Sequence, residues 1–378
     1  MDGGRNYVND RTLIRLLELF THLLPLVRLH QHTLPLGHLL KNVIPRLKAI
    51  LYILAIILVP PPPQIPKYDL VLLEGNFGRV NQRGRGRDCW EELVHDGPRF
   101  RMLTGETPEA LNTLANDLTG QLLSRKRNAR KYRRFKLSAR NRLLMIFIWL
   151  RHYPREELLA AQFGVSRNVV SMDIQYLIPV LWHYFHGSIR WPINGQWQAL
   201  MGTWDFFPNA VGAIDGTQTE VNIPLSEPQH EFYSGHLHYH CISTQIIIDC
   251  DRNIRFLRSG FLGHSNDAMQ YHLLPSIGHG QELELPQHAY LLADSIYPNR
   301  YPLLTPFRRN QINHDDNMEL FNLEHRRCRI AVEHVISYFK TYAVMKGVYR
   351  HGRWLLPVIA DICAVLAHRH IVVNRDLR

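Results

Sequence analysis

The chain has 378 residues, which at roughly 150 residues per domain is enough for two or three domains. Hydrophobic residues make up 46% and charged residues 20%, values that exclude a wholly disordered or a fibrous protein. Lys and Arg outnumber Asp and Glu by 44 to 33, and the net charge of +11 predicts an acidic partner, nucleic acid before a membrane surface. The five cysteines are scattered without a CxxC pair, so neither a disulfide framework nor a cysteine-rich zinc finger is expected.

Residues 1–66 form a leader rich in Leu, His and Pro that carries no motif linked to chemistry. Its longest apolar run, residues 49–59, has 11 residues, whereas a membrane-spanning helix needs about 20. Four prolines at positions 60–63 then stop any helix. We therefore expect a buried helix or an extended segment here, and no membrane anchor.

Residues 67–136 are predicted to be a basic linker that contains one helix. Helical periodicity spans residues 109–123, and the densest charge run of the chain, residues 125–136, follows it with eight basic residues and no acidic one. Such a run is typical of a solvated helix face or a localisation signal, and equally of contact with DNA phosphates. The candidate phosphate contacts are Arg125, Arg130, Arg133 and Arg134.

Residues 137–201 have the pattern of a helix-turn-helix. Apolar positions from Leu143 to Leu150 predict a helix that ends before Pro154, and residues 155–163 predict a short second helix. Gly164 can adopt the left-handed turn that joins the second helix to a third.

Ser166 is a natural N-cap for this third helix, which we expect to end near Leu177, before Pro179. It would present Arg167, Asn168 and Ser171 to phosphates or base edges. A plain helical subdomain that packs on its neighbour is the alternative interpretation.

Residues 202–378 change from helical to alternating patterns and predict a mixed α/β domain. Strands are expected over residues 211–215, 239–249, 254–259 and 289–293, with a hairpin turn at residues 250–253. A long helix is expected over residues 319–344.

Three carboxylates occupy informative places in this domain. Asp215 and Asp294 each follow an apolar strand, and strand tips lie side by side about 4.8 Å apart and open toward solvent. Glu333 lies in apolar and basic surroundings, where an acid is either paired with a cation such as Arg329 or bound to a metal ion. Two-metal phosphodiester cleavage needs several carboxylates at one point, because each ion takes only one or two protein ligands.

His236, His238 and His240 alternate along a predicted strand and would share one face of it. That geometry can hold zinc, but no fourth ligand is apparent in the sequence. We expect these histidines to line a polar edge and to contact DNA near the site.

Several ordered motifs resemble one known family. They are VGAIDGT, SGHLHYHCISTQIIIDCDRNIRF, LGHSNDAMQY, LLADSIYP, LLTPFR and FNLEHRRCRIAVEHVISYFK. Together they resemble the DDE domain of PIF/Harbinger-type transposases and their host-adopted nuclease relatives. The resemblance spans roughly residues 207–349, and the segment before it is similar to the family's helix-turn-helix.

The resemblance implies an RNase H-like mixed sheet flanked by helices, preceded by an all-α helix-turn-helix unit. It implies a nuclear DNA transposase or endonuclease that uses Mg²⁺ or Mn²⁺, cuts phosphodiester bonds and joins strands. Its catalytic triad falls on Asp215, Asp294 and Glu333, and a further metal-site acid falls on Asp267. The expected partners are DNA, either transposon ends or host DNA, a Myb/SANT-like protein, and further copies of the chain on DNA.

The chain also departs from the family pattern at several motif positions. Gln218, His264, Asn266, Ile296, His334 and Ser337 replace the usual residues, and Ala367 is an apparent insertion. None of these changes removes a predicted metal ligand. They keep open the alternative of a catalytically decayed, domesticated DNA-binding protein.

Overall fold

The structure is a computed structural model that describes residues 86–123, 136–312 and 315–376. The predicted leader, residues 1–66, and the arginines at 125, 130, 133 and 134 lie outside the described residues. The described helices before residue 202 and the sheet after it belong to one compact unit. The predicted boundaries at residues 66, 136 and 201 stay predictions.

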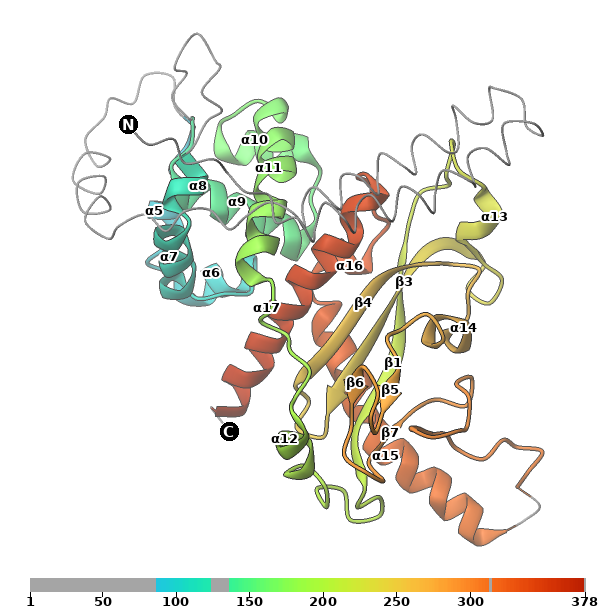
Figure 1. Cartoon of the computed structure of the whole chain (residues 1–378). Helices are drawn as coiled ribbons and strands as arrows, with labels where there is room; N and C mark the ends of the chain where they lie inside the picture. Colours follow the sequence, from blue (N-terminus) through green and yellow to red (C-terminus); the bar gives the residue numbers. More distant parts are fainter. Residues whose placement is uncertain (1–85, 124–135, 313–314, 377–378) are drawn as a thin grey trace, which may run out of the picture. The chain divides into compact units, whose positions relative to one another are not determined.

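The N-terminal part of the described chain is helical (Figure 1). Its helices are α5 (Cys89–Leu93), α6 (Gly97–Thr104), α7 (Pro108–Asp117), α8 (Thr119–Leu123), α9 (Ala139–His152), α10 (Glu156–Phe163), α11 (Arg167–Phe185) and α12 (Asn194–Gln198). The helix predicted over residues 109–123 is divided between α7 and α8, because Leu118 leaves the helical conformation (φ −98°, ψ 6°). Helix α9 lies at the centre of this part, since every residue from Asn141 to Leu150 is buried.

Helices α9, α10 and α11 confirm the predicted helix-turn-helix. Gly164 ends α10 in the left-handed region (φ 62°), which costs a glycine no steric strain. Ser166 precedes α11 as predicted but makes no side-chain cap hydrogen bond. The predicted end of the third helix near Leu177 is wrong, because α11 continues through Pro179 to Phe185. The burial of Leu181 and Phe185 compensates for the hydrogen bond that proline cannot donate.

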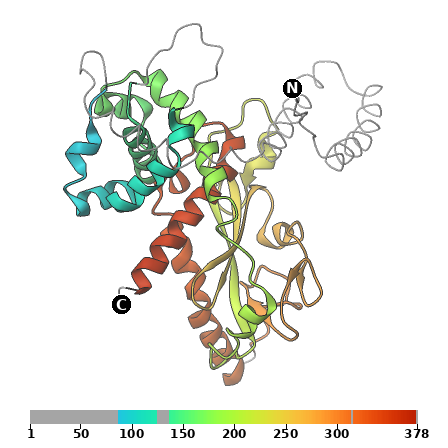
Figure 2. The same cartoon turned by 60° about the vertical axis from the view of Figure 1, so that its left-hand side comes forward.

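The C-terminal part is a mixed sheet with helices on both faces, which confirms the predicted fold class (Figure 2). The main strands are β1 (Ala210–Glu220), β3 (Tyr239–Asp249), β4 (Ile254–Leu262), β7 (Tyr290–Leu292) and β8 (Leu303–Leu304), and β2 (Tyr233–Ser234), β5 (Ile277–Gly278) and β6 (Leu283–Glu284) are short. The helices are α13 (Gln229–Phe232), α14 (Asp267–Tyr271), α15 (Asp316–Phe339), α16 (Ala343–Lys346) and α17 (Leu356–Asp376), with a 3₁₀ turn at Arg353–Leu355.

The sheet has β1 near its centre. Strand β3 is antiparallel to β1, and β4 and the short β2 are antiparallel to β3. On the other side of β1, β7 and β8 are parallel to it in turn. The sheet therefore has an antiparallel half and a parallel half that meet at β1.

Two apolar cores cover the two faces of the sheet. Ala213, Ile246 and Leu292 belong to the core that contains α15 and α17, whereas Ile214 and Ile247 belong to a second core on the opposite face. The alternation follows from the two-residue period of a strand. The long helix predicted over residues 319–344 is α15, which ends earlier, at Phe339.

Helix α17 is the most apolar helix of the domain. Residues 353–373 are long and apolar enough to cross a membrane by length and composition, but 56% of that window is buried inside the protein. It packs on β4, α15 and α11. Its Asp361 accepts a hydrogen bond from Trp182 of α11 at 2.7 Å, which links the two parts. These contacts are those of a core helix.

A buried ion pair joins α9 to α11 and generates a stability prediction. Arg142 donates to both carboxylate oxygens of Asp173, at 3.0 and 2.6 Å, and their side chains are 2% and 10% exposed. Replacing Arg142 with Met should lower the free energy of unfolding by about 3–5 kcal/mol, because Asp173 would keep a buried charge without its partner. Urea unfolding followed by circular dichroism measures this loss.

The matched control is the exposed ion pair between Arg87 and Glu92, whose side chains are 60% and 47% exposed. Arg87→Met should change the free energy of unfolding by less than about 1 kcal/mol. Equal losses from the two substitutions would contradict the role assigned to burial. The double variant Arg142→Met/Asp173→Leu should recover part of the loss, since no charge is then left buried.

Candidate active site

The predicted catalytic aspartates lie where β7 ends beside β1. In the parallel pairing of these strands Ala213 faces Leu292, so Asp215 and Asp294 each lie two residues farther on in the same direction. Asp294 follows its strand, as predicted. Asp215 was predicted at a strand tip, which is wrong, because β1 continues to Glu220 along its antiparallel partner β3. The end of β7 nevertheless leaves Asp215 without a strand neighbour on that side.

Asp267 joins them from the start of α14. Its carboxylate lies directly over Gly216, because a Cβ atom on Gly216 would come within 2.1 Å of Asp267 Oδ1. Only glycine at this position allows so close an approach. The DGT sequence thus brings Asp267 next to Asp215, in agreement with its predicted place in the site.

A buried hydrogen-bond network that the sequence analysis missed holds Asp267. Gln245 of β3 donates to Asp267 Oδ1 at 2.7 Å and to Gln270 Oε1 at 2.9 Å. The Tyr297 hydroxyl donates to Gln245 Oε1, and Tyr297 follows Asp294 by three residues. Gln245 is fully buried. A glutamine inside the apolar run of β3 was the one available signal, because buried polar groups need partners.

Glu333 is connected to this group through Arg329. Both residues lie on α15, four positions apart, and Arg329 donates to Glu333 Oε1 and, at 2.9 Å, to Asp215 Oδ2. The ion pair between Arg329 and Glu333 confirms the pairing that their spacing predicts. The bridge from Arg329 to Asp215 was not predicted, because it depends on how α15 packs on β1.

Burial raises the pKa of two of the acids. The pKa of Asp215 rises to about 6, mainly through burial and further through Asp267 and Asp294, while Arg329 and the Gly216 N–H oppose the rise. Burial likewise raises the pKa of Asp267, and the hydrogen bond from Gln245 opposes it. Since Asp294 raises both values, the three aspartates are close enough to repel one another.

The donor set fits a hard divalent cation such as Mg²⁺ or Mn²⁺, because the acids supply only oxygen ligands and repel one another without a positive charge between them. Within residues 86–123, 136–312 and 315–376, no three His, Cys, Asp or Glu side chains already stand as a ligand group. In this arrangement Arg329 supplies the positive charge between Asp215 and Glu333. The assignment of the four acids as metal ligands remains a prediction.

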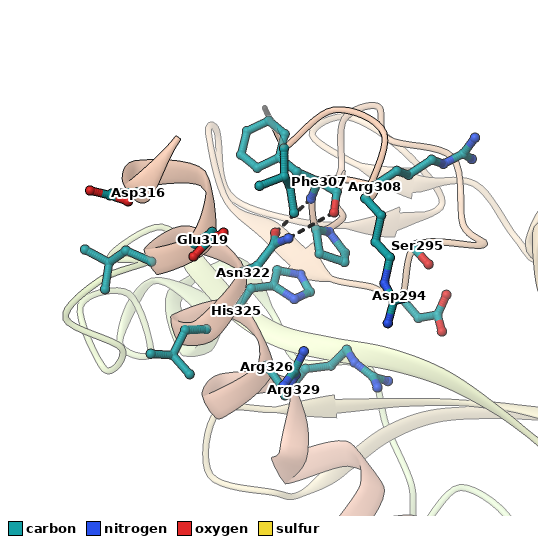
Figure 3. Close-up of a pocket in the computed structure, with 15 residues that line it drawn as sticks. Asp294, Ser295, Phe307, Arg308, Asp316, Glu319, Asn322, His325, Arg326 and Arg329 are labelled. Atoms are coloured by element: carbon teal, nitrogen blue, oxygen red, sulfur yellow. Dashed lines mark hydrogen bonds between the residues drawn. The ribbon is translucent and has the colours of Figure 1, made fainter. Parts of the chain in front are cut away.

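A cavity of about 840 Å³ opens beside Asp294 (Figure 3). Strand β8 is followed by the segment that carries Phe307 and Arg308 on one side of it, and α15 contributes Arg326 and Arg329 on the other. Arg329 therefore lines the cavity and also bridges Asp215 and Glu333. Nothing in the local sequence pattern indicated this cavity.

The predicted histidine face is wrong. Strand β3 begins only at Tyr239, and His238 has a left-handed backbone (φ 60°) in the turn before it. His236, His238 and His240 therefore do not alternate along one strand. His236 does lie near the acids, since it lowers the pKa of Asp267.

The predicted DNA contacts of the third helix lie at the start of α11. Arg167 and Asn168 are exposed, and Ser171 is half-buried. Arg167 forms ion pairs with Glu156 and Glu157 of α10, both at 3.1 Å, so a phosphate would have to compete with these two acids. Contact of these three residues with DNA remains a prediction.

The arginine bridge generates a pH prediction for the metal-free protein. With Arg329→Gln, the pKa of Asp215 should move above its value of about 6, because Arg329 opposes the rise more than any other group. A pH titration followed by carboxyl ¹³C NMR measures it. Since folding raises this pKa from 3.8, the contribution of Asp215 to stability is full below pH 3.8 and is lost as the pH rises through about 6.

The control for this titration is Arg326→Gln, on the exposed face of the same helix. It should leave the pKa of Asp215 unchanged. A pKa of Asp215 that stays at about 6 in Arg329→Gln would show that the bridge is absent in solution.

Comparison with known proteins agrees with this geometry. Residues 214–368 match the family described as DDE superfamily endonuclease, and residues 135–183 match the helix-turn-helix of DDE superfamily endonuclease. The Protein ALP1-like of Arabidopsis thaliana is 24% identical over 233 residues, and the match covers 57% of this chain and 56% of that protein. The chain thus spans little more than half of that relative, and no solved structure matches. Residues 214–368 are therefore a domain of the DDE superfamily endonuclease family, preceded at residues 135–183 by the helix-turn-helix domain of the same family.

Proposed function

We propose that this chain is a transposase or endonuclease that cleaves DNA phosphodiester bonds by divalent-metal-dependent in-line displacement and joins DNA strands. The observation that carries the proposal is the convergence of Asp215, Asp267 and Asp294 at the end of β7, with Glu333 tied to Asp215 through Arg329. Family membership supports nuclease chemistry with divalent metals.

Asp215, Asp294 and Glu333 are the proposed catalytic ligands, with Asp267 as the fourth acid. A bound divalent cation would supply the positive charge that activates the attacking hydroxyl group and stabilises the leaving oxygen. Glu333 and Asp215 can take part only if Arg329 releases at least one of its two ion pairs. Gln245 and Tyr297 keep Asp267 in place through the buried network.

The biological setting follows from the same proposal. The relation to Protein ALP1-like and the ordered motifs support the PIF/Harbinger subtype. For such a protein we propose nuclear localisation, transposon ends or host DNA as the substrate, a Myb/SANT-like partner protein and assembly of several copies on DNA. The helix-turn-helix is the proposed anchor on duplex DNA, through Asn168 and Ser171 and through Arg167 once phosphate replaces its acidic partners.

A second candidate is a DNA-binding protein of the same family that has lost catalysis. The bridge from Arg329 to both Asp215 and Glu333 favours it, because the bridge leaves these acids already neutralised. The departures from the family motifs also favour this second function. One of them is Ile296, which lies two residues after Asp294 and has an exposed side chain. DNA binding without metal-dependent cleavage would identify this second function.

The test is cleavage of supercoiled plasmid and of linear DNA by the purified full chain in Mg²⁺ or Mn²⁺. Asp294→Asn and Glu333→Gln should each slow cleavage by at least about 100-fold, because each removes a proposed ligand of the cation that would act on the reacting phosphate. Cleavage is measured as nicked and linear product over time.

The matched control is Glu324→Gln, on the same helix as Glu333. Glu324 pairs with Arg327 and does not line the cavity beside Asp294. It should cleave like the wild type. Equal cleavage by Asp294→Asn, Glu333→Gln and the wild type would mean that a contaminating nuclease or another site does the chemistry.

A further inference from the structure

Several arginines line the cavity beside Asp294. Arg308, Arg309 and Arg326 line it, and within the part of the chain that the structure describes their guanidinium groups form no ion pair or hydrogen bond. Arg329 reaches the same cavity while it holds Asp215 and Glu333 (Figure 3). Unpaired arginines around one cavity favour a ligand with phosphate groups, because guanidinium binds phosphate through paired hydrogen bonds.

The same cavity has an apolar wall. Leu320 and Leu323 of α15 are 47% and 43% exposed although they are large and apolar. Phe307 also lines the cavity, where its backbone is hydrogen-bonded to Asn322 of α15 and its ring packs edge-on against Phe321 at 5.0 Å. Exposed leucines at the edge of a cavity suit a planar, largely apolar group, and a nucleobase is such a group.

The volume of the cavity and its two acidic residues further restrict the class of ligand that it can bind. About 840 Å³ is the volume of a small-molecule site, and a base stacked inside a duplex cannot enter it. Asp316 and Glu319 also line the cavity. Carboxylates can accept hydrogen bonds from the amino groups of cytosine or adenine, whereas they would repel a ligand made of phosphates alone.

We propose that this cavity binds one unpaired nucleotide of the DNA strand that passes Asp294. Arg308 and Arg326 hold its phosphates, and its base packs against Leu320 and Leu323. This inference rests on the proposed function. A strand bound in this cavity would be separated from its duplex beside the acids that are proposed to cleave it. Binding itself requires neither metal nor cleavage.

The experiment measures binding of fluorescein-labelled 10-nucleotide single strands to the full chain by fluorescence anisotropy, in EDTA. Arg308→Ala/Arg326→Ala should weaken binding about tenfold. It should also flatten the slope of log K against log salt by about 1.4, since each phosphate contact to a single strand contributes about 0.7. Leu320→Gln should weaken binding of the normal strand but not of an abasic strand of the same length.

Two controls test whether the loss of binding is specific to the cavity and to unpaired bases. Arg327→Ala removes an exposed arginine next in the chain, which pairs with Glu324 outside the cavity, and should leave binding unchanged. A hairpin duplex should bind the Arg308→Ala/Arg326→Ala variant within about twofold of wild type, because the base in a duplex is not available.

Three results would overturn the proposal. They are an equal loss with Arg327→Ala, an equal loss for the hairpin, and abasic strands that bind the wild type as tightly as normal strands. Binding is measured in EDTA, where metal-dependent cleavage cannot occur, so this test does not depend on catalysis. A chain that binds single strands as expected but cuts no DNA in Mg²⁺ or Mn²⁺ would refute the proposed catalysis and leave this binding site supported.

Discussion

Negative charge brought together at the end of β7 is the constraint on which the rest of the domain depends. Asp215, Asp267 and Asp294 are partly buried, and Asp294 lies close enough to raise the pKa of both Asp215 and Asp267. Without a cation such a group would protonate or separate. In this structure the cation is Arg329, which connects Asp215 on the sheet to Glu333 on α15. The packing of α15 on the sheet and the charge state of the acids are therefore linked.

The remaining contacts around the acids serve to hold this arrangement. Gly216 allows Asp267 to lie against the backbone of β1, and Gln245 fixes its carboxylate from β3. Tyr297 completes the network from the segment that carries Asp294. Residues from β3, α14 and the segment after β7 thus hold one of the acids, Asp267, in a buried polar network.

Much of this arrangement could be predicted from the sequence, and what could not depends on contacts between distant segments. The strand-then-acid pattern located Asp215 and Asp294, and the four-residue spacing paired Arg329 with Glu333. The length of β1 was missed, because the apolar run ends at Asp215 and only the pairing with β3 extends the strand to Glu220. Pro179 indicated a helix end, but burial of Leu181 and Phe185 keeps α11 helical. The cavity could not be predicted, because Arg308 and Arg326 meet only after α15 has packed.

Helix α17 has a consequence for how the chain can be divided. One side of it covers β4, and another receives α11, where Trp182 meets Asp361. A fragment that begins after residue 201 would therefore leave an apolar helix bare on the side that α11 covers, and helices of this composition adhere to membranes and to each other. A fragment that ends at residue 201 would leave Trp182 of α11 without its contact with α17. The helices before residue 202 and the sheet domain after it therefore depend on each other to bury apolar surface.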